Sequence, residues 1–321
     1  MLRRLALPAL FVFFIASTLW GRDQQPEIRT GFWRGQWVTY TWVPGKDGKG
    51  KAIYQGDILL DNVKDSPNSP QGESLGVAYS SYLWPPVNGV SQIPYTIDPS
   101  SGDLTNLNTA ISQFNSTFAG LIQLVPYTNQ SDYINFDFDP NNTSGTCEAY
   151  EGRVGGEQTV GGSGTCTVAT ILHEMGHTVG VWHEQSRPDR NTYVNVNYGA
   201  VIKASRSFFD QFLDNDQELT PYDYASVMEY PAFSFSRNGE PCIESIPAGI
   251  PLSNPNGYSA GDIDGIERLY GAIPTQVTVT TNPPGLQVIV DGNTVTTPQV
   301  YNWALNSTHT LTVPSLSLIH I

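Results

Sequence analysis

The sequence is short of positive charge, of cysteine and of long apolar runs. Its 321 residues carry 16 lysines and arginines against 30 aspartates and glutamates, which gives a formal net charge of −14. Binding to nucleic acid needs clustered basic side chains, so this charge balance argues against a nucleic-acid partner. Beyond the first 20 residues, no stretch is apolar enough to span a membrane. The length allows one sizeable domain and a smaller one.

Residues 1–20 are typical of a secretion signal. Arg3 and Arg4 precede a short apolar core, and small residues follow it in a pattern that suits cleavage. A membrane anchor is the alternative, but the stretch is shorter than the roughly 20 apolar residues that a span requires, and it contains Pro8. We therefore expect a secreted protein, extracellular or periplasmic, with no stable membrane span after signal removal.

The three cysteines are Cys147, Cys166 and Cys242. In an exported chain, Cys147 and Cys166 could close a loop in an oxidising compartment. Cys242 is then the third cysteine, outside that pair, and two interpretations of it remain open. It is either a free buried thiol or the site of a bridge between chains.

The middle of the chain mixes strand and helix patterns. Residues 93–98 and 133–139 have the alternation of strands. Residues 104–127 carry apolar side chains at helical spacing and then become strand-like, and residues 260–271 have the features of a last helix. Before this region, residues 21–77 are polar, with no strong periodicity until residue 52 and a linker-like run at 64–76.

The composition changes again after residue 273. Residues 275–313 are β-branched and alternating, with NPPG and DGN turns between the runs. We expect a separate all-β module that is too short to close a stable sandwich alone. The last residues continue no pattern, so we expect the module either to be incomplete or to end in a foreign tail.

Three of the five histidines fall inside the run HEMGHTVGVWH. On a helix, four residues turn through about 400°, so His173 and His177 lie on one face and both reach one metal ion. A continued helix would point His183 away, so the helix must end, and Gly180 stands where a positive φ is needed. Glu174 lies beside the first ligand and can touch a metal-bound water. This spacing is the long zinc-protease signature, whereas the alternative is a helix whose histidines are merely structural.

Two further runs extend the motif, HEQSRPDRNTYVNVNY from residue 183 and YDYASVMEYPAFSFS from residue 222. With IPYTID upstream and ERLYG downstream, they resemble the astacin family of metzincin zinc endopeptidases over roughly residues 83–271. The resemblance implies an α+β fold. Its zinc protease domain, at 78–273, has a twisted, mainly parallel sheet with an antiparallel edge strand, two long helices and an active-site cleft. The small all-β module follows at 274–321.

The resemblance also implies the roles of the site residues. His173, His177 and His183 would hold one Zn²⁺ per chain, with Glu174 as the general base and then the acid. Tyr230 would ligate the zinc at rest and stabilise the transition state.

Four more residues take structural roles from the same resemblance. Met228 would form the floor under the metal, and Glu184 would pair with the mature N-terminus. Cys147 and Cys166 would form a disulfide, whereas a second family disulfide has no counterpart here. Position 229 is glutamate where many relatives have histidine.

Upstream, Tyr54-Gln55-Gly56-Asp57 resembles the FxGD motif of astacin propeptides, whose aspartate ligates the zinc in place of the catalytic water. An ordinary turn is the alternative. We predict that residues 21–77 are a propeptide in which Asp57 blocks the zinc. An activating protease would cut the chain between Asp57 and Trp84.

The C-terminal module resembles β-rich repeats attached to secreted bacterial hydrolases. It suggests a bacterial source and attachment to a surface or substrate, with a passive spacer as the alternative.

Together these features predict a secreted zinc endopeptidase that is made as a zymogen and acts on proteins or peptides. We expect an extended substrate to lie along an edge strand near residues 153–158. Two alternatives remain. One is a catalytically inactive metzincin-fold protein for binding or adhesion, and the other is an amidase that acts on cell-wall peptides.

Overall fold

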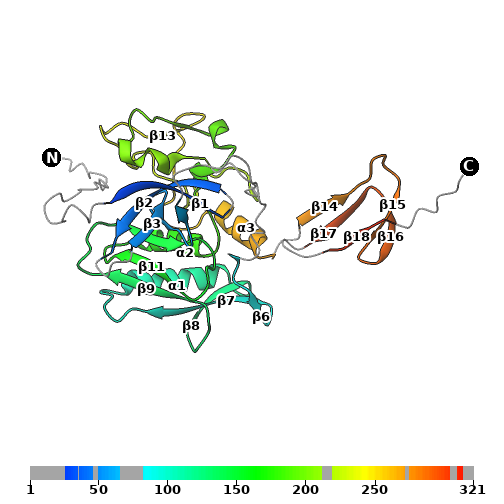
Figure 1. Cartoon of the computed structure of the whole chain (residues 1–321), viewed down its shortest axis with the longest axis horizontal. Helices are drawn as coiled ribbons and strands as arrows, with labels where there is room; N and C mark the ends of the chain where they lie inside the picture. Colours follow the sequence, from blue (N-terminus) through cyan, green and yellow to red (C-terminus); the bar gives the residue numbers. More distant parts are fainter. Residues whose placement is uncertain are drawn as a thin grey trace, which may run out of the picture. The chain divides into compact units, whose positions relative to one another are not determined.

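The computed structural model of the chain describes residues 26–34, 36–45, 50–65, 82–211, 219–271, 275–303 and 309–313. The chain divides into two compact units, residues 1–263 and 264–321, which Figure 1 shows coloured along the sequence. The predicted secretion signal and most of the predicted linker at 64–76 lie outside the described residues.

One mixed sheet of eleven strands organises the first unit. Six of its strands come from the part of the unit that begins at residue 82, which the sequence predicts to be catalytic and which is here called the catalytic half. They are β6 (Pro86–Val87), β7 (Val90–Ile97), β8 (Ile122–Pro126), β9 (Tyr133–Asp139), β10 (Cys147–Tyr150) and β11 (Glu157–Ser163). Strands β8, β7, β9 and β11 run parallel to one another, and β10 is antiparallel to β11. The predicted fold, a mainly parallel sheet with an antiparallel edge strand, is therefore confirmed.

The alternation of buried residues along strand β9 shows why this segment forms part of a sheet. Ile134, Phe136 and Phe138 alternate along it and are buried, whereas the residues between them are half-buried. Successive strand residues point to opposite faces, so the three apolar side chains all lie on one face of the sheet.

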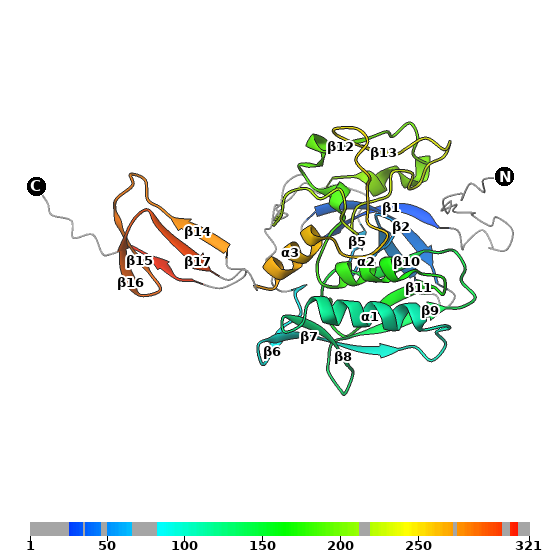
Figure 2. The same ribbon diagram turned by 180° about the vertical axis from the view of Figure 1, so that it is seen from behind.

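Two helices pack side by side on one face of this sheet, as both views show (Figures 1 and 2). In α1 (Thr105–Thr117) the buried residues are Leu107, Ala110, Ile111 and Phe114, the spacing of one helical face. The other helix, α2 (Val168–Thr178), begins at Thr167, whose side chain accepts a hydrogen bond from the Thr170 amide. Both helices lie where the sequence predicts them.

Residues 26–65, here called the N-terminal segment, continue the same sheet. They contain β1 (Glu27–Trp33), β2 (Gln36–Pro44), β3 (Gly50–Tyr54), β4 (Ile58–Leu59) and β5 (Lys64–Asp65). The strands pair in the order β5-β1-β2-β3-β4, and β4 then pairs in parallel with β10. The sequence showed no strong periodicity before residue 52, so the β1–β2 hairpin was missed.

An aromatic cluster joins the N-terminal segment to the rest of the unit. Trp33, Tyr40 and Tyr54 are buried in it, and Trp182, which precedes His183, packs against them. The ring centroids of Trp33 and Trp182 are 5.5 Å apart in an edge-on arrangement. Burial of such large rings dominates the energy of an interface, so the segment is packed against the catalytic half as well as hydrogen-bonded to it.

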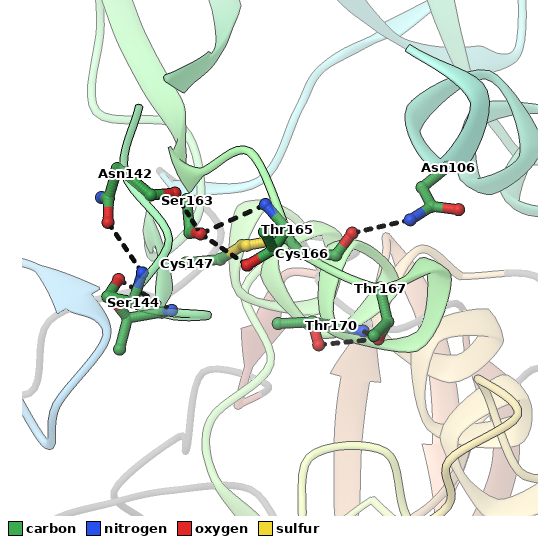
Figure 3. The surroundings of a disulfide bond; sticks show 10 residues. Asn106, Asn142, Ser144, Cys147, Ser163, Thr165, Cys166, Thr167 and Thr170 are labelled. Carbon is green, nitrogen blue, oxygen red and sulfur yellow. Dashed lines mark hydrogen bonds between the residues drawn. A yellow bond between two sulfur atoms is a disulfide. The ribbon is translucent and has the colours of Figure 1, made fainter. Parts of the chain in front are cut away.

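A disulfide joins Cys147, the first residue of β10, to Cys166, which lies just before α2 (Figure 3). Asn106 at the start of α1 donates a hydrogen bond of 3.0 Å to the Cys166 carbonyl. The predicted pairing is confirmed, and Cys242 is buried and free. The disulfide thus ties the start of α2 to the strand on which the N-terminal segment pairs.

Residues 184–211 and 219–259 consist mainly of loops and short elements. These are the 3-10 turns η3 (Glu184–Ser186), η4 (Arg190–Thr192) and η5 (Lys203–Phe209) and the strands β12 (Val194–Val196) and β13 (Ile243–Ser245). The buried Arg190 side chain donates to the carbonyls of Gln185 and Phe209, so one guanidinium joins η3 to η5.

The second unit begins within α3 (Ala260–Leu269) and is otherwise built of strands. Its strands are β14 (Thr275–Val279), β15 (Gln287–Val290), β16 (Asn293–Thr296), β17 (Gln299–Trp303) and β18 (Leu311–Thr312). Val279, Val288 and Val290 form its small buried core. The predicted all-β region is therefore confirmed. Among the described residues of the whole chain, none of the helices has the length and apolarity needed to cross a membrane.

Candidate metal centre

The chain reverses after α2 as the histidine spacing requires. The φ angle of Gly180 is 94°, a conformation that costs glycine little. The Gly180 amide donates to the His177 carbonyl at 2.8 Å, and the Val181 amide donates to the Gly176 carbonyl at 3.0 Å. This pair of bonds is the Schellman arrangement of helix ends, and it brings His183 back beside the helix.

The three histidines converge through the same ring nitrogen. The Nε2 atom of His173 lies 3.1 Å from Nε2 of His177 and 3.3 Å from Nε2 of His183. His177 and His183 are fully buried, and His173 is partly so. The helix supplies the first two rings one turn apart, and the reversal supplies the third.

The other ring nitrogens show which tautomer each histidine adopts. Nδ1 of His173 lies 2.8 Å from the Val227 carbonyl, and Nδ1 of His177 lies 2.8 Å from the Val181 carbonyl. A carbonyl oxygen only accepts, so each Nδ1 carries the proton and each Nε2 presents a lone pair. Burial lowers the pKa of His177, which keeps that ring in the neutral form that binds metal.

The N-terminal segment adds a carboxylate to the three rings. Asp57 carboxylate oxygens lie 3.2 Å from Nε2 of His183, 3.4 Å from that of His173 and 3.9 Å from that of His177. Gln55 and Gly56 both have positive φ angles, and this tight turn places Asp57 over the histidines.

These four groups fit one zinc ion. Their ligand atoms all lie within 4.8 Å of one another. Three imidazole lone pairs and a carboxylate that face one another repel unless a cation lies among them, and three nitrogens with one oxygen are a ligand set typical of tetrahedral zinc. The structure therefore brings together the three predicted histidines and the predicted Asp57.

Glu174 is buried beside the first ligand. Burial, and then the charge of Asp57, raises its pKa well above the ordinary value. Its Oε2 atom has no hydrogen-bond partner among the described residues. A carboxylate in this state is a strong base once a proton donor reaches it.

Tyr230 is buried against the third histidine. Its ring centroid lies 4.7 Å from that of His183, and its hydroxyl donates to the main-chain carbonyl of Gln55. Burial raises the pKa of Tyr230 well above its ordinary value, so the hydroxyl stays protonated and remains a donor.

Met228 and Glu184 form the base of the site. A Cβ atom on Gly176 would lie 2.6 Å from the Met228 sulfur, so the methionine packs closely under α2. The Glu184 amide donates to the Met228 carbonyl at 3.0 Å, and the Glu184 carboxylate accepts from the Asp223 amide at 2.8 Å. At position 229, where the resemblance leads us to expect histidine, the buried Glu229 accepts a hydrogen bond from the Tyr222 hydroxyl.

Sequence reasoning missed the role of Gln55. Its side-chain oxygen lies 2.9 Å from Nδ1 of His183 and accepts from the Ser186 hydroxyl at 3.0 Å, while its amide nitrogen donates to the Asp210 carbonyl. Gln55 is the variable position of the motif that contains Asp57, so the motif gave no signal for it.

The edge strand that we expected near residues 153–158 lies earlier in the chain. In that range only Glu157 and Gln158 belong to a strand, β11, and they pair with β9, whereas β10 pairs with β11 further along, at residues 160–162. The edge of the catalytic half is β10, on which β4 of the N-terminal segment pairs. Ala149 of β10 donates from its amide to the Asp57 carbonyl at 3.1 Å, so this edge runs directly past the metal ligands.

Comparison with known proteins matches residues 77–271 to the astacin family of peptidases. Zinc metalloproteinase nas-13 from Caenorhabditis elegans is 36% identical over 60% of this chain and 42% of that protein. Embryonic protein UVS.2 from Xenopus laevis is 31% identical over 67% of this chain and 40% of that protein. High choriolytic enzyme 1 from Oryzias latipes is 36% identical over 60% of this chain and 70% of that protein.

One solved structure supports the same match. High choriolytic enzyme 1, a hatching enzyme zinc-protease from Oryzias latipes (Medaka fish), has a TM-score of 0.55 and 32% identity and covers 61% of this chain and 98% of that chain. The chain spans only about two fifths of the length of nas-13 and UVS.2. All three named relatives are animal proteins, so they lend no support to the bacterial source that the C-terminal module suggested.

Proposed function

Because this chain belongs to the astacin family of peptidases, we propose that it is a secreted zinc-dependent endopeptidase made as a zymogen. The observation that carries the proposal is the convergence of three Nε2 lone pairs and the Asp57 carboxylate on one point. Glu174 and Tyr230 stand beside this point with the chemistry that peptide hydrolysis needs. Their presence favours an enzyme over an inactive protein for binding or adhesion.

The residues of the site have different roles in the proposed hydrolysis. When bound to the three histidines, the zinc polarises the scissile carbonyl and acidifies water. The Glu174 carboxylate takes a proton from the attacking water and returns it to the leaving amine. The Tyr230 hydroxyl donates a hydrogen bond to the oxygen on which charge develops.

The N-terminal segment explains how the zymogen stays inactive. Asp57 occupies the ligand position that water needs, and the Gln55 carbonyl takes the hydrogen bond of the Tyr230 hydroxyl. Strand β4 covers the edge of β10 on which an extended substrate would pair. An activating protease that cuts after Asp57 and before Trp84 would free all three features at once.

Glu184 is the candidate partner of the new N-terminus after that cut. In the present structure its carboxylate pairs with Arg187 at 3.2 Å, and burial raises its pKa to about 7. A second cation would satisfy this buried carboxylate further. We therefore propose that the mature amino group binds Glu184 and fixes the loop around Met228.

The test removes the base and keeps the ligands. In activated Glu174→Gln we expect about one zinc per chain, as in the wild type, and a loss of casein hydrolysis of about a hundredfold to ten-thousandfold. The matched control is Glu240→Gln, which removes an exposed carboxylate of the same unit and should leave both quantities unchanged. A fully active Glu174→Gln protein, or wild-type hydrolysis that survives complete zinc removal, would refute the proposal.

A further inference from the structure

A buried carboxylate lies at the end of the substrate edge and takes no part in the mechanism above. Glu151 directly follows β10 and is 2% exposed. Among the described residues, its side chain has one polar partner, Arg34 at the tip of the β1–β2 hairpin. Arg34 belongs to the N-terminal segment, so this partner leaves when the segment is cut away.

The Arg34 guanidinium occupies a pocket formed by Glu151 and Tyr82. One guanidinium nitrogen pairs with the Glu151 carboxylate, and the other donates to the Glu151 main-chain carbonyl at 3.0 Å. The guanidinium carbon lies 3.6 Å from the ring centroid of Tyr82. The nitrogen that donates to the carbonyl also pairs with Asp61 of the N-terminal segment at 3.0 Å, so two of the three oxygens that hold the cation belong to Glu151. A planar cation held by several oxygens and an aromatic face is the arrangement in which arginine differs most from lysine.

Both walls of this pocket belong to the catalytic half. The Arg153 amide donates to the Tyr82 carbonyl at 2.6 Å, and the Gly152 amide donates to the His177 carbonyl at 2.8 Å. These bonds fix Tyr82 and Glu151 to each other and to the last turn of the metal-binding helix. The pocket therefore stays beside the metal centre after Arg34 has gone, and its carboxylate is then without a counter-ion.

The pocket lies on a defined side of the site. Asp57 lies at the metal centre, and the two residues after Asp57 pair with Ala149 and Tyr150 of β10. Glu151 comes directly after Tyr150, so it lies further along the edge of β10. A substrate that pairs antiparallel to β10, the more stable ladder, has its N-terminal residues at this end. We propose that Glu151 and Tyr82 form a subsite for an arginine side chain N-terminal to the scissile bond, and that Arg34 occupies it in the zymogen.

The inference rests on the proposed peptidase function and deepens it. A carboxylate buried without a partner is costly, so a cationic substrate side chain that pairs with it gains a charge-assisted hydrogen bond. Such a bond is worth about tenfold to one-hundredfold in binding. Lysine, as a single point donor, cannot reach both Glu151 oxygens in the same way and should gain less.

The test uses the full chain, activated by a cut between Asp57 and Tyr82, which keeps both walls of the pocket, and peptides that differ at one position. Each series places arginine, lysine or neutral citrulline at one position upstream of the bond. In the wild type, kcat/KM should be about tenfold to one-hundredfold higher for arginine than for citrulline at one upstream position, with lysine between them. Glu151→Gln should abolish this ratio, and the control Glu240→Gln should keep it.

The outcomes separate this inference from the function on which it rests. Casein hydrolysis without any upstream arginine preference in the wild type would refute the subsite and leave the peptidase intact. A preference that Glu151→Gln retains would also refute it. Absence of all zinc-dependent hydrolysis in the wild type would overturn both. The wild-type peptide series decides the question even where Glu151→Gln does not fold, because it needs no variant.

Discussion

The Gln55 side chain accepts a hydrogen bond from Nδ1 of His183 across 2.9 Å, although the two residues lie 128 positions apart in the chain. The acceptors of the other two histidines are main-chain carbonyls of the catalytic half, at Val181 and Val227. One of the three histidines is therefore oriented by a residue that the proposed maturation would remove.

We expect Gln55→Met to weaken zinc binding in the uncut chain. The variant keeps the length of the side chain but removes the acceptor of His183, and loss of such a partner typically lowers metal affinity about tenfold to one-hundredfold. Competition with a chelator measures the dissociation constant. Gln55→Glu, which keeps an acceptor oxygen, should bind more tightly than Gln55→Met. After maturation all three proteins have one sequence and must agree, so equal affinities in the uncut forms would contradict the prediction.

Asp57→Asn should give the uncut chain activity on small peptides. The amide has the shape of the carboxylate but lacks its charge, so water competes with it more easily for the fourth position. We expect hydrolysis of a fluorogenic peptide to rise about tenfold or more over the uncut wild type, since a charged contact is worth about 1.5–3 kcal/mol. Glu27→Gln, an exposed change in the same segment, should stay inactive. Mass spectrometry must show an uncut chain, and an inactive Asp57→Asn would speak against the blocking role.

Tyr230→Phe should lower kcat of the mature protein about a hundredfold and leave KM nearly unchanged. The hydroxyl serves the oxyanion more than the bound substrate, so its loss affects the transition state selectively. Tyr224→Phe is the control, because that exposed hydroxyl in the same loop donates only to the Ile246 carbonyl among the described residues. Steady-state kinetics on one peptide decides, and an unchanged kcat would remove Tyr230 from the mechanism.

The buried Glu229 should make stability depend on pH. Burial raises its pKa from 4.5 to about 8, so between these values the folded carboxyl keeps a proton that the unfolded chain has lost. The unfolded state then binds fewer protons, and stability falls as pH rises through this window. Glu229→Gln is neutral at every pH, so its melting temperature should fall less than that of the wild type between about pH 5 and pH 8. Parallel curves for the two zinc-loaded proteins would show that Glu229 does not titrate there.

The sequence predicts the metal centre well because its geometry is local. The His173–His177 spacing is fixed by one turn of helix, and Gly180 marks the reversal that returns His183. Strands β7, β8 and β9 and helix α1 follow from periodic apolar residues, whereas β10 and the Gly-rich β11 were not predicted from the sequence. The motif around Asp57 was recognised from its resemblance to the FxGD motif, because a Gly-Asp turn alone does not indicate a metal ligand.

Contacts between distant segments could not be predicted in this way. The pairing of Arg34 with Glu151 joins residues 117 positions apart, and nothing near either residue indicates the other. The edge of the sheet was misplaced because strand order depends on which neighbours a strand finds in space. For the β1–β2 hairpin the sequence did hold a signal, although not a periodic one, since Arg34 and Gly35 stand in it between two runs rich in aromatic and β-branched residues.

Strand β4 and the strand it covers belong to one polypeptide, and this has a consequence for the zymogen. An inhibitor tethered to its own target meets it at a fixed effective concentration, often in the millimolar range for short flexible connections. If the uncut chain is latent as proposed, its latency should therefore be independent of dilution. Once the connection is cut, the same strand must hold by its own affinity, and dilution into the surrounding medium then acts as the final step of activation.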